Sequence, residues 1–173
     1  MCKVYTPYAH AKSIFEIEID FYKKHGIKTV LSDLDNTLDS YKSKTPSANV
    51  VAFKEVLKEN GIELFIISNN TGKRVKLYAD TLGVRYASAV GKPFAKKLLR
   101  KLHEAQIDPK TAVMIGDQTT TDIASANRAR ILCILTDKIV KEDQPTTHFN
   151  RLFDRPIRRH LSRKGKLIDW RER

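Results

Sequence analysis

Residues 29–37 read TVLSDLDNT, an apolar run that ends in two aspartates separated by a single residue. The apolar part is typical of a buried strand, and the interior of a strand disfavours aspartate. Asp33 and Asp35 are close enough to repel each other unless something cationic lies between them. The pair therefore indicates a charged site at the end of a strand.

Around this run, short apolar segments alternate with helical patterns. The other strand-like segments are residues 63–68, 85–87, 112–116 and 131–135. They are continuously apolar rather than alternating, which is typical of parallel strands buried on both faces. The amphipathic helical patterns cover residues 47–60, 71–82 and 93–105. This order predicts an α/β fold, a doubly wound parallel sheet within a three-layer sandwich.

The third helical pattern is strongly amphipathic. Its predicted apolar face consists of Phe94, Leu98, Leu102 and Ala105. Pro93 suits the first turn of a helix, where a missing N–H does no harm. We therefore expect this helix to begin at Pro93 and to pack on the sheet through that face.

The bulk composition favours one globular domain over residues 1–173. With 41% hydrophobic residues, a chain of this length can bury a stable core without disulfides or structural metal ions. The two cysteines form no metal-spaced cluster, which favours a reducing, cytoplasmic location. The apolar runs are far shorter than the roughly 20 residues of a spanning helix, so any membrane contact is expected to be peripheral, at the inner face.

The formal charge of +12 is concentrated near the C-terminus. Residues 151–173 form a basic segment with nine Lys or Arg against three acids, a net charge of +6. Such a run is either a solvated face or a surface for a polyanion, such as an anionic membrane or a nucleic acid. Phe153, Ile157 and Leu161 recur in it at helical spacing, although Pro156 puts that helix in question. Two interpretations stay open: this face docks on the domain, or it contacts a membrane.

Polar residues follow four of the predicted strands. Asp33 and Asp35 end the first, and the others are followed by Ser68-Asn69, Gly91-Lys92 and GDQTTTD, residues 116–122. Ligands of doubly wound folds bind beyond the carboxyl ends of the strands. We expect all these groups to meet at one edge of the sheet.

In this order the four motifs resemble those of the haloacid dehalogenase (HAD) superfamily of phosphatases, over residues 29 to about 127. The resemblance implies an HAD-like Rossmannoid fold and a phosphoric monoester hydrolase. It implies that Asp33 attacks phosphorus to form an aspartyl-phosphate, and that Asp35 is the acid/base. An acid at position 35 favours a phosphatase, because an alkoxide is a poor leaving group.

The same resemblance implies roles for the other residues. Mg²⁺ would be held by Asp33, Asp117 and the backbone carbonyl of Asp35, and Lys92 would balance the charge of the nucleophile and phosphoryl group. Phosphate would be bound by Ser68 and Asn69. Thr37 is expected to fix the strand-exit loop through its hydroxyl, and Asp122 to orient Lys92 or a metal-bound water.

Members of this superfamily often carry a cap domain, but the chain has no room for one. Residues 38–46 form a short polar loop, and residues 68–92 hold one helix and one short strand. A capless, open site suits a phosphate monoester on a bulky substrate: a lipid headgroup, a polymer end or a protein.

A finer resemblance covers residues 15 to about 159. The segments SNNTGKRV, GKPFAKKLLR and THFNRLFDR are similar to the YqeG-like (subfamily IIIA) branch, which includes phosphatidylglycerophosphate phosphatases. The chain departs from that branch with three threonines at 119–121, where bulkier apolar residues are expected. The resemblance to this branch implies phosphatidylglycerophosphate, a lipid whose headgroup carries the phosphate, as the leading substrate hypothesis, and with it a role in phospholipid biosynthesis.

Two alternatives stay open. The basic charge equally suits a nucleic-acid end phosphatase, or a basic RNA- or ribosome-binding module with a vestigial site. Retention of Asp33, Asp35, Lys92 and Asp117 counts against the vestigial site. The sequence leaves the oligomeric state open.

Overall fold

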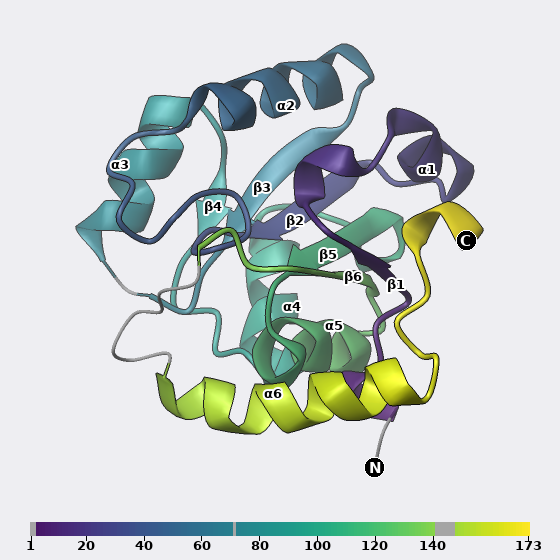
Figure 1. Ribbon diagram of the computed structural model, residues 1–173. Coiled ribbons are helices and arrows are strands. Elements are labelled where there is room, and N and C mark those ends of the chain that lie inside the picture. The colour runs from purple at the N-terminus through teal and green to yellow at the C-terminus, as the bar shows by residue number, and fades with distance from the viewer. Residues whose placement is uncertain (1–2, 71, 141–147) are drawn as a thin grey trace.

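A computed structural model describes residues 3–70, 72–140 and 148–173, with the backbone alone for residues 148–151. Six parallel strands form one sheet in the order β1-β6-β5-β2-β3-β4 (Figure 1). The strands are Ala9–Ala11 (β1), Thr29–Asp33 (β2), Glu63–Ile67 (β3), Tyr86–Ala87 (β4), Ala112–Gly116 (β5) and Leu132–Thr136 (β6). The predicted doubly wound parallel sheet is confirmed, and β1, too short to show a pattern, is an addition to it.

The direction of winding reverses at the centre of the sheet. From β2 the chain moves outward through β3 and β4, then returns to β5 on the other side of β2 and continues to β6. β2 and β5 are therefore neighbours, with Leu31 opposite Met114. The carboxyl ends of these two strands form the switch point at which open α/β sheets bind ligands.

Helices cover both faces of the sheet (Figure 1). The α-helices are Ile19–Lys24 (α1), Ala48–Glu59 (α2), Lys73–Leu82 (α3), Ala95–Glu104 (α4), Ala124–Ala129 (α5) and His148–Arg163 (α6). Short turns of other helix types are Lys3–Tyr5 (η1), Ile14–Glu16 (η2), Pro109–Thr111 (η3), Thr119–Ile123 (η4) and Trp170–Glu172 (η6). One core joins α1, α2 and α3 to the sheet, and a second joins α4 and α5 to its other face.

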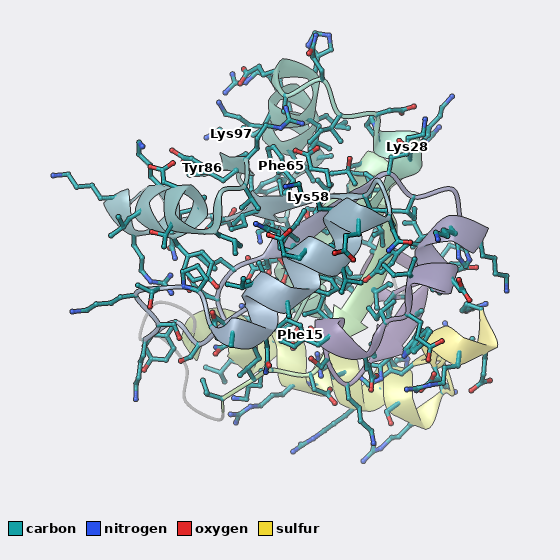
Figure 2. All side chains as sticks on the ribbon, turned by 90° about the horizontal axis from the view of Figure 1, so that it is seen from above. Phe15, Lys28, Lys58, Phe65, Tyr86 and Lys97 are labelled. Carbon is teal, nitrogen blue, oxygen red and sulfur yellow. The ribbon has the colours of Figure 1, made fainter. Side chains whose placement is uncertain are left out.

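The first core also includes the segment before α1. Seen from above (Figure 2), Phe15 lies against α2. Its ring meets that of Phe53 edge-on, with the ring centroids 5.6 Å apart. This contact holds the N-terminal segment on the same face of the sheet as α2.

Two of the helices are followed by a glycine that ends them. Gly61 and Gly83, just beyond α2 and α3, take the left-handed conformation with φ of +70° and +72°. The prediction for α4 was wrong at its start, because the helix begins at Ala95 and Pro93 lies in the preceding loop, after a cis peptide bond. Phe94 is consequently the residue before the helix, and 68% of its surface is exposed.

The basic segment forms a real helix, α6, which continues through Pro156. The turn around Pro156 is exposed, so water can satisfy the carbonyl that the missing N–H leaves without a donor. Leu161 is buried and Ile157 half-buried, whereas Phe153 is 59% exposed. The docking interpretation therefore holds for the second half of the apolar face.

No cap domain covers the sheet edge in the described part of the chain. Between β2 and α2 lies a loop, and between β3 and α4 lie α3 and β4. None of the described helices is long and apolar enough to cross a membrane.

Candidate active site

Two carboxylates meet at the switch point because their strands are neighbours. Asp33 is the last residue of β2, and Asp117 follows directly after β5. Ser32 pairs with Ile115 in the register, so the two strands end at the same level. The side chain of Asp117 is buried, whereas that of Asp33 remains 13% exposed. Asp33 is thus the carboxylate that a substrate can reach.

Lys92 lies at the centre of the site. Its side chain is almost fully buried, and its Nζ donates to Oδ1 of Asp33 and to Oδ1 of Asp122, each at 2.6 Å. A longer bond of 3.4 Å reaches the carbonyl of Ile67 at the end of β3. One ammonium group therefore links the ends of β2 and β3 to the helical turn η4 that follows β5.

The backbone of Lys92 is held by Asn69. The amide group of Asn69 donates to the carbonyl of Lys92 and accepts from its N–H, both at 2.8 Å. Asn69 therefore positions Lys92, and the second hydrogen of its amide group remains able to donate to a phosphate, the role expected from the sequence. Ser68 is buried, and its Oγ accepts from the N–H of Asn70, so its O–H stays available as a donor.

Asp122 orients Lys92, which is one of the two roles that the sequence left open for it. Its Oδ1 accepts from Lys92, and its Oδ2 accepts from the N–H of Gln118 at 3.1 Å. The carboxylate fits because residue 116 is glycine: a Cβ at Gly116 would lie 2.4 Å from Cγ of Asp122. The sequence analysis missed this role of Gly116, although glycine directly before Asp117 was a visible signal.

Asp35 faces away from this cluster. Its Oδ1 accepts from Nη1 of Arg74 at 2.5 Å, and its Oδ2 accepts from the side-chain amide of Asn70 at 3.0 Å. Nη2 of Arg74 also donates to the carbonyls of Ser40 and Ser43. Arg74, which the sequence analysis did not single out, therefore ties Asp35 to the strand-exit loop.

Thr37 does not fix the strand-exit loop through its hydroxyl, although the sequence predicted that it would. Its hydroxyl is buried and has no hydrogen-bond partner among the described residues. The loop is fixed instead by Asp39, whose carbonyl accepts from the N–H of Asn36 and whose Oδ2 accepts from the N–H of Ser47 and the hydroxyl of Tyr78. Burial, together with the bond to Asp39, raises the pKa of Tyr78 far above its ordinary value.

Burial and crowding set the charges of the central pair. Burial raises the pKa of the Asp33 carboxyl well above its ordinary value; Lys92 opposes this, while Asp122 and Asp117 add to it. Burial alone would lower the pKa of Lys92, but its two carboxylate partners outweigh that effect and raise it. Lys92 is therefore a permanent cation, and the surplus negative charge around it favours binding of a further cation.

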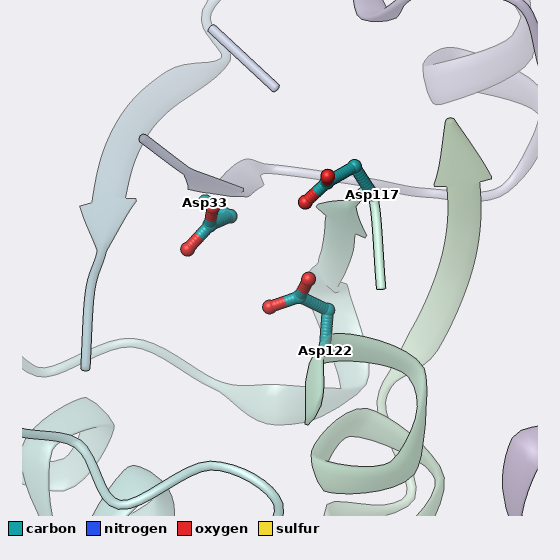
Figure 3. A group of neighbouring side chains, drawn as sticks. All are labelled: Asp33, Asp117 and Asp122. Atoms are coloured by element: carbon teal, nitrogen blue, oxygen red, sulfur yellow. The ribbon is translucent and has the colours of Figure 1, made fainter. Parts of the chain in front are cut away.

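The donor atoms suit such a cation. Asp33, Asp117 and Asp122 each offer a carboxylate oxygen within 4.8 Å of the others, and Figure 3 shows the three side chains around one shared space. Carboxylate oxygens are hard ligands of the kind that divalent metals such as Mg²⁺ prefer. This acidic triad could hold a divalent metal.

Comparison with known proteins agrees with this site. Residues 10–130 match the family described as haloacid dehalogenase-like hydrolase. The chain is also 34% identical over 170 residues to the "Probable phosphatase YqeG" of Bacillus subtilis (strain 168), with 98% of each chain covered.

Solved structures share the fold at low sequence identity. An HAD phosphatase from Thermococcus onnurineus gives a TM-score of 0.54 at 15% identity, covering 69% of this chain and 90% of that one. The cobalt-bound deoxy-D-mannose-octulosonate 8-phosphate phosphatase of Haemophilus influenzae gives 0.52 at 15% identity, covering 84% and 93%. These likenesses concern the architecture alone.

Replacing Asp33 by asparagine should stabilise the metal-free protein. A group whose pKa is raised in the folded state contributes stability below its unfolded pKa and loses that contribution as the pH rises through the folded value. In EDTA at pH 8, Asp33→Asn should therefore melt higher than the wild type, by about 2–4 °C for each kcal/mol of relieved repulsion. The difference should shrink toward pH 5.

Thermal unfolding in EDTA between pH 5 and pH 8 measures this difference. Asp20→Asn, which neutralises an exposed carboxylate, is the matched control and should show no such trend. A wild type that melts above Asp33→Asn at pH 8 would contradict the repulsion described here.

Proposed function

The chain belongs to the haloacid dehalogenase-like hydrolases and is a phosphatase, and we propose that it uses Mg²⁺ and an aspartyl-phosphate on Asp33 to dephosphorylate phosphatidylglycerophosphate. One observation carries the catalytic part of this proposal. Lys92 joins Asp33 to Asp122 beside Asp117, at the switch point of the sheet. A nucleophile, a cation and metal-binding oxygens thus meet in one place.

The first step is an attack by a carboxylate oxygen of Asp33 on phosphorus. The bond between phosphorus and the substrate's ester oxygen breaks, and Asp35 gives that oxygen a proton. In the structure the carboxylate of Asp35 accepts hydrogen bonds from Arg74 and Asn70. The proposed role therefore requires Asp35 to turn toward the leaving oxygen when substrate binds.

The second step releases phosphate. Asp35 takes a proton from a water molecule, which attacks phosphorus and frees the Asp33 carboxylate. During both steps, Lys92 offsets the negative charge on the nucleophile and the phosphoryl group. The hydroxyl of Ser68, buried just after the end of β3, has a hydrogen to donate to a phosphoryl oxygen.

Asp33, Asp117 and the backbone carbonyl of Asp35 would hold the metal. When bound, Mg²⁺ supplies positive charge that lets an anionic nucleophile approach a dianionic phosphate monoester. In this assignment Asp122 orients Lys92, from which it accepts a hydrogen bond, rather than serving as a ligand.

The substrate part of the proposal is supported by the open sheet edge and by the surface of α6. An uncapped site can receive a headgroup that projects from a membrane. Two large apolar side chains on α6, Leu152 and Phe153, are 71% and 59% exposed, and the neighbouring Arg155 is exposed as well. Apolar and basic groups together suit the interface of an anionic bilayer. The protein would then act as a peripheral protein at the inner, cytoplasmic face of the membrane.

A second candidate is dephosphorylation of nucleic-acid ends. The charge of +12 favours it, because Lys and Arg that neutralise backbone phosphates provide affinity for any polynucleotide. The same catalytic residues would serve either substrate.

The role of Asp35 can be tested with leaving groups of different quality. Asp35→Asn should slow the phosphorylation of Asp33 by an alkyl ester by about 10²- to 10⁴-fold. An aryl ester such as p-nitrophenyl phosphate should lose much less, because its leaving group needs no proton. Rapid-mixing measurements of the first turnover give the rate of Asp33 phosphorylation for each of the two esters. Equal losses for both esters would show that Asp35 is not the acid.

The substrate can be tested by phosphate release in Mg²⁺ buffer. Phosphatidylglycerophosphate in anionic vesicles should be hydrolysed faster than a 5′-phosphorylated oligonucleotide. The double variant Leu152→Ser/Phe153→Ser should lose about tenfold or more on vesicles, where both side chains would be buried, and little on p-nitrophenyl phosphate. A preference for the oligonucleotide, with a steep salt dependence, would contradict the lipid substrate and favour nucleic acid instead.

A further inference from the structure

We propose that Asp154 and Arg158 on α6 are positioning residues for the metal ligand Asp117. They fix the backbone of residues 117–120, so that divalent-metal affinity depends on a helix outside the family-matched residues 10–130. This inference rests on the proposed metal site, and the experiment below separates the failure of one from the failure of the other.

Asp154 holds the segment that follows Asp117. Its Oδ1 accepts three hydrogen bonds, from the N–H and the Oγ1 of Thr119, both at 2.6 Å, and from the N–H of Thr120 at 3.3 Å. The residue is 2% exposed. Hydrogen bonds to an ionised carboxylate in such surroundings are stronger than those between neutral groups. The threonines at 119 and 120 thus act as the anchor for α6.

Arg158 holds Asp117 itself. Its Nη2 donates to the carbonyl of Asp117 at 3.0 Å and also to the carbonyl of Thr136 at the end of β6. Its Nη1 donates to Oδ1 of Asp137 at 3.0 Å. The guanidinium therefore clamps the backbone of the metal ligand against the end of the neighbouring strand.

The two side chains also work as a pair. They lie one helical turn apart, and Nε of Arg158 is 3.5 Å from Oδ2 of Asp154. Between them they bond to residues 117, 119 and 120, where the chain passes from β5 into η4. The direction of the Asp117 carboxylate depends on this backbone, because its buried side chain has little freedom of its own.

Simple docking of α6 does not need these charges. Leu161, buried on the same helix, already supplies apolar contact. Asp154 is buried and the side chain of Arg158 is only 23% exposed, and such partial burial of an ion pair is costly compared with apolar packing, so it is best explained where a particular geometry matters. A loop that carries a metal ligand is such a place, because supporting contacts around ligands tune metal affinity.

The experiment measures Mg²⁺ binding to the full chain by titration calorimetry, with no substrate present. Arg158→Met and Asp154→Asn should each weaken Mg²⁺ affinity by about 10- to 100-fold, the usual effect of losing a support behind a ligand. Arg158→Lys keeps the charge but not the planar fork, so it should recover only part of the loss. Arg159→Met removes an exposed charge from the next position of α6 and should change the affinity less than twofold.

Hydrogen exchange on the wild type gives a second measurement that does not depend on variants that fold. In EDTA, the amides of Thr119 and Thr120 should exchange as slowly as those of the core strands. Rapid exchange there would overturn the proposal, as would folded Arg158→Met and Asp154→Asn proteins with wild-type affinity. A wild type that binds no Mg²⁺ would overturn this proposal and the proposed metal site together.

Discussion

The site depends on one ammonium group shared by two carboxylates. Nζ of Lys92 lies 2.6 Å from a carboxylate oxygen of both Asp33 and Asp122, close to Asp117. Three carboxylates at one sheet edge, two of them buried and one largely so, would otherwise repel one another and destabilise the fold. Asn69 and Gly116 serve this arrangement, the first by holding the backbone of Lys92 and the second by leaving room for Asp122. The surplus negative charge that remains is the reason why the site suits a divalent metal.

Most of the fold and the centre of the site could be predicted because both follow from short-range pattern and topology. Continuous apolar runs locate β2, β3, β5 and β6 to within a residue or so, and parallel strands bring their carboxyl ends to one edge. Asp33, Lys92, Asp117 and Asp122 meet there as expected. The local errors were at α4, where Pro93 was placed inside the helix and Phe94 in the core.

The supporting residues could not be predicted, since each one acts through a partner distant in the sequence. Arg74 pairs with Asp35, Tyr78 with Asp39, and Asp154 with Thr119, and no periodicity links the members of such pairs. The sequence therefore assigned Thr37 to the loop, a task that packing gives to Asp39, and it did not reveal that Asn69 holds the backbone of Lys92. The basic segment was ambiguous for the same reason, because only packing distinguishes Arg158, turned toward Asp117, from its exposed neighbours.

The central claim is that Asp33 carries the phosphoryl group during turnover. Borohydride reduces an aspartyl-phosphate to homoserine with loss of phosphate, which marks the modified residue permanently. The enzyme, quenched during steady-state turnover of a phosphate monoester, then reduced and digested, should contain homoserine at position 33 in its peptide mass spectrum. An actively turning-over sample with homoserine elsewhere, or with none, would contradict this account.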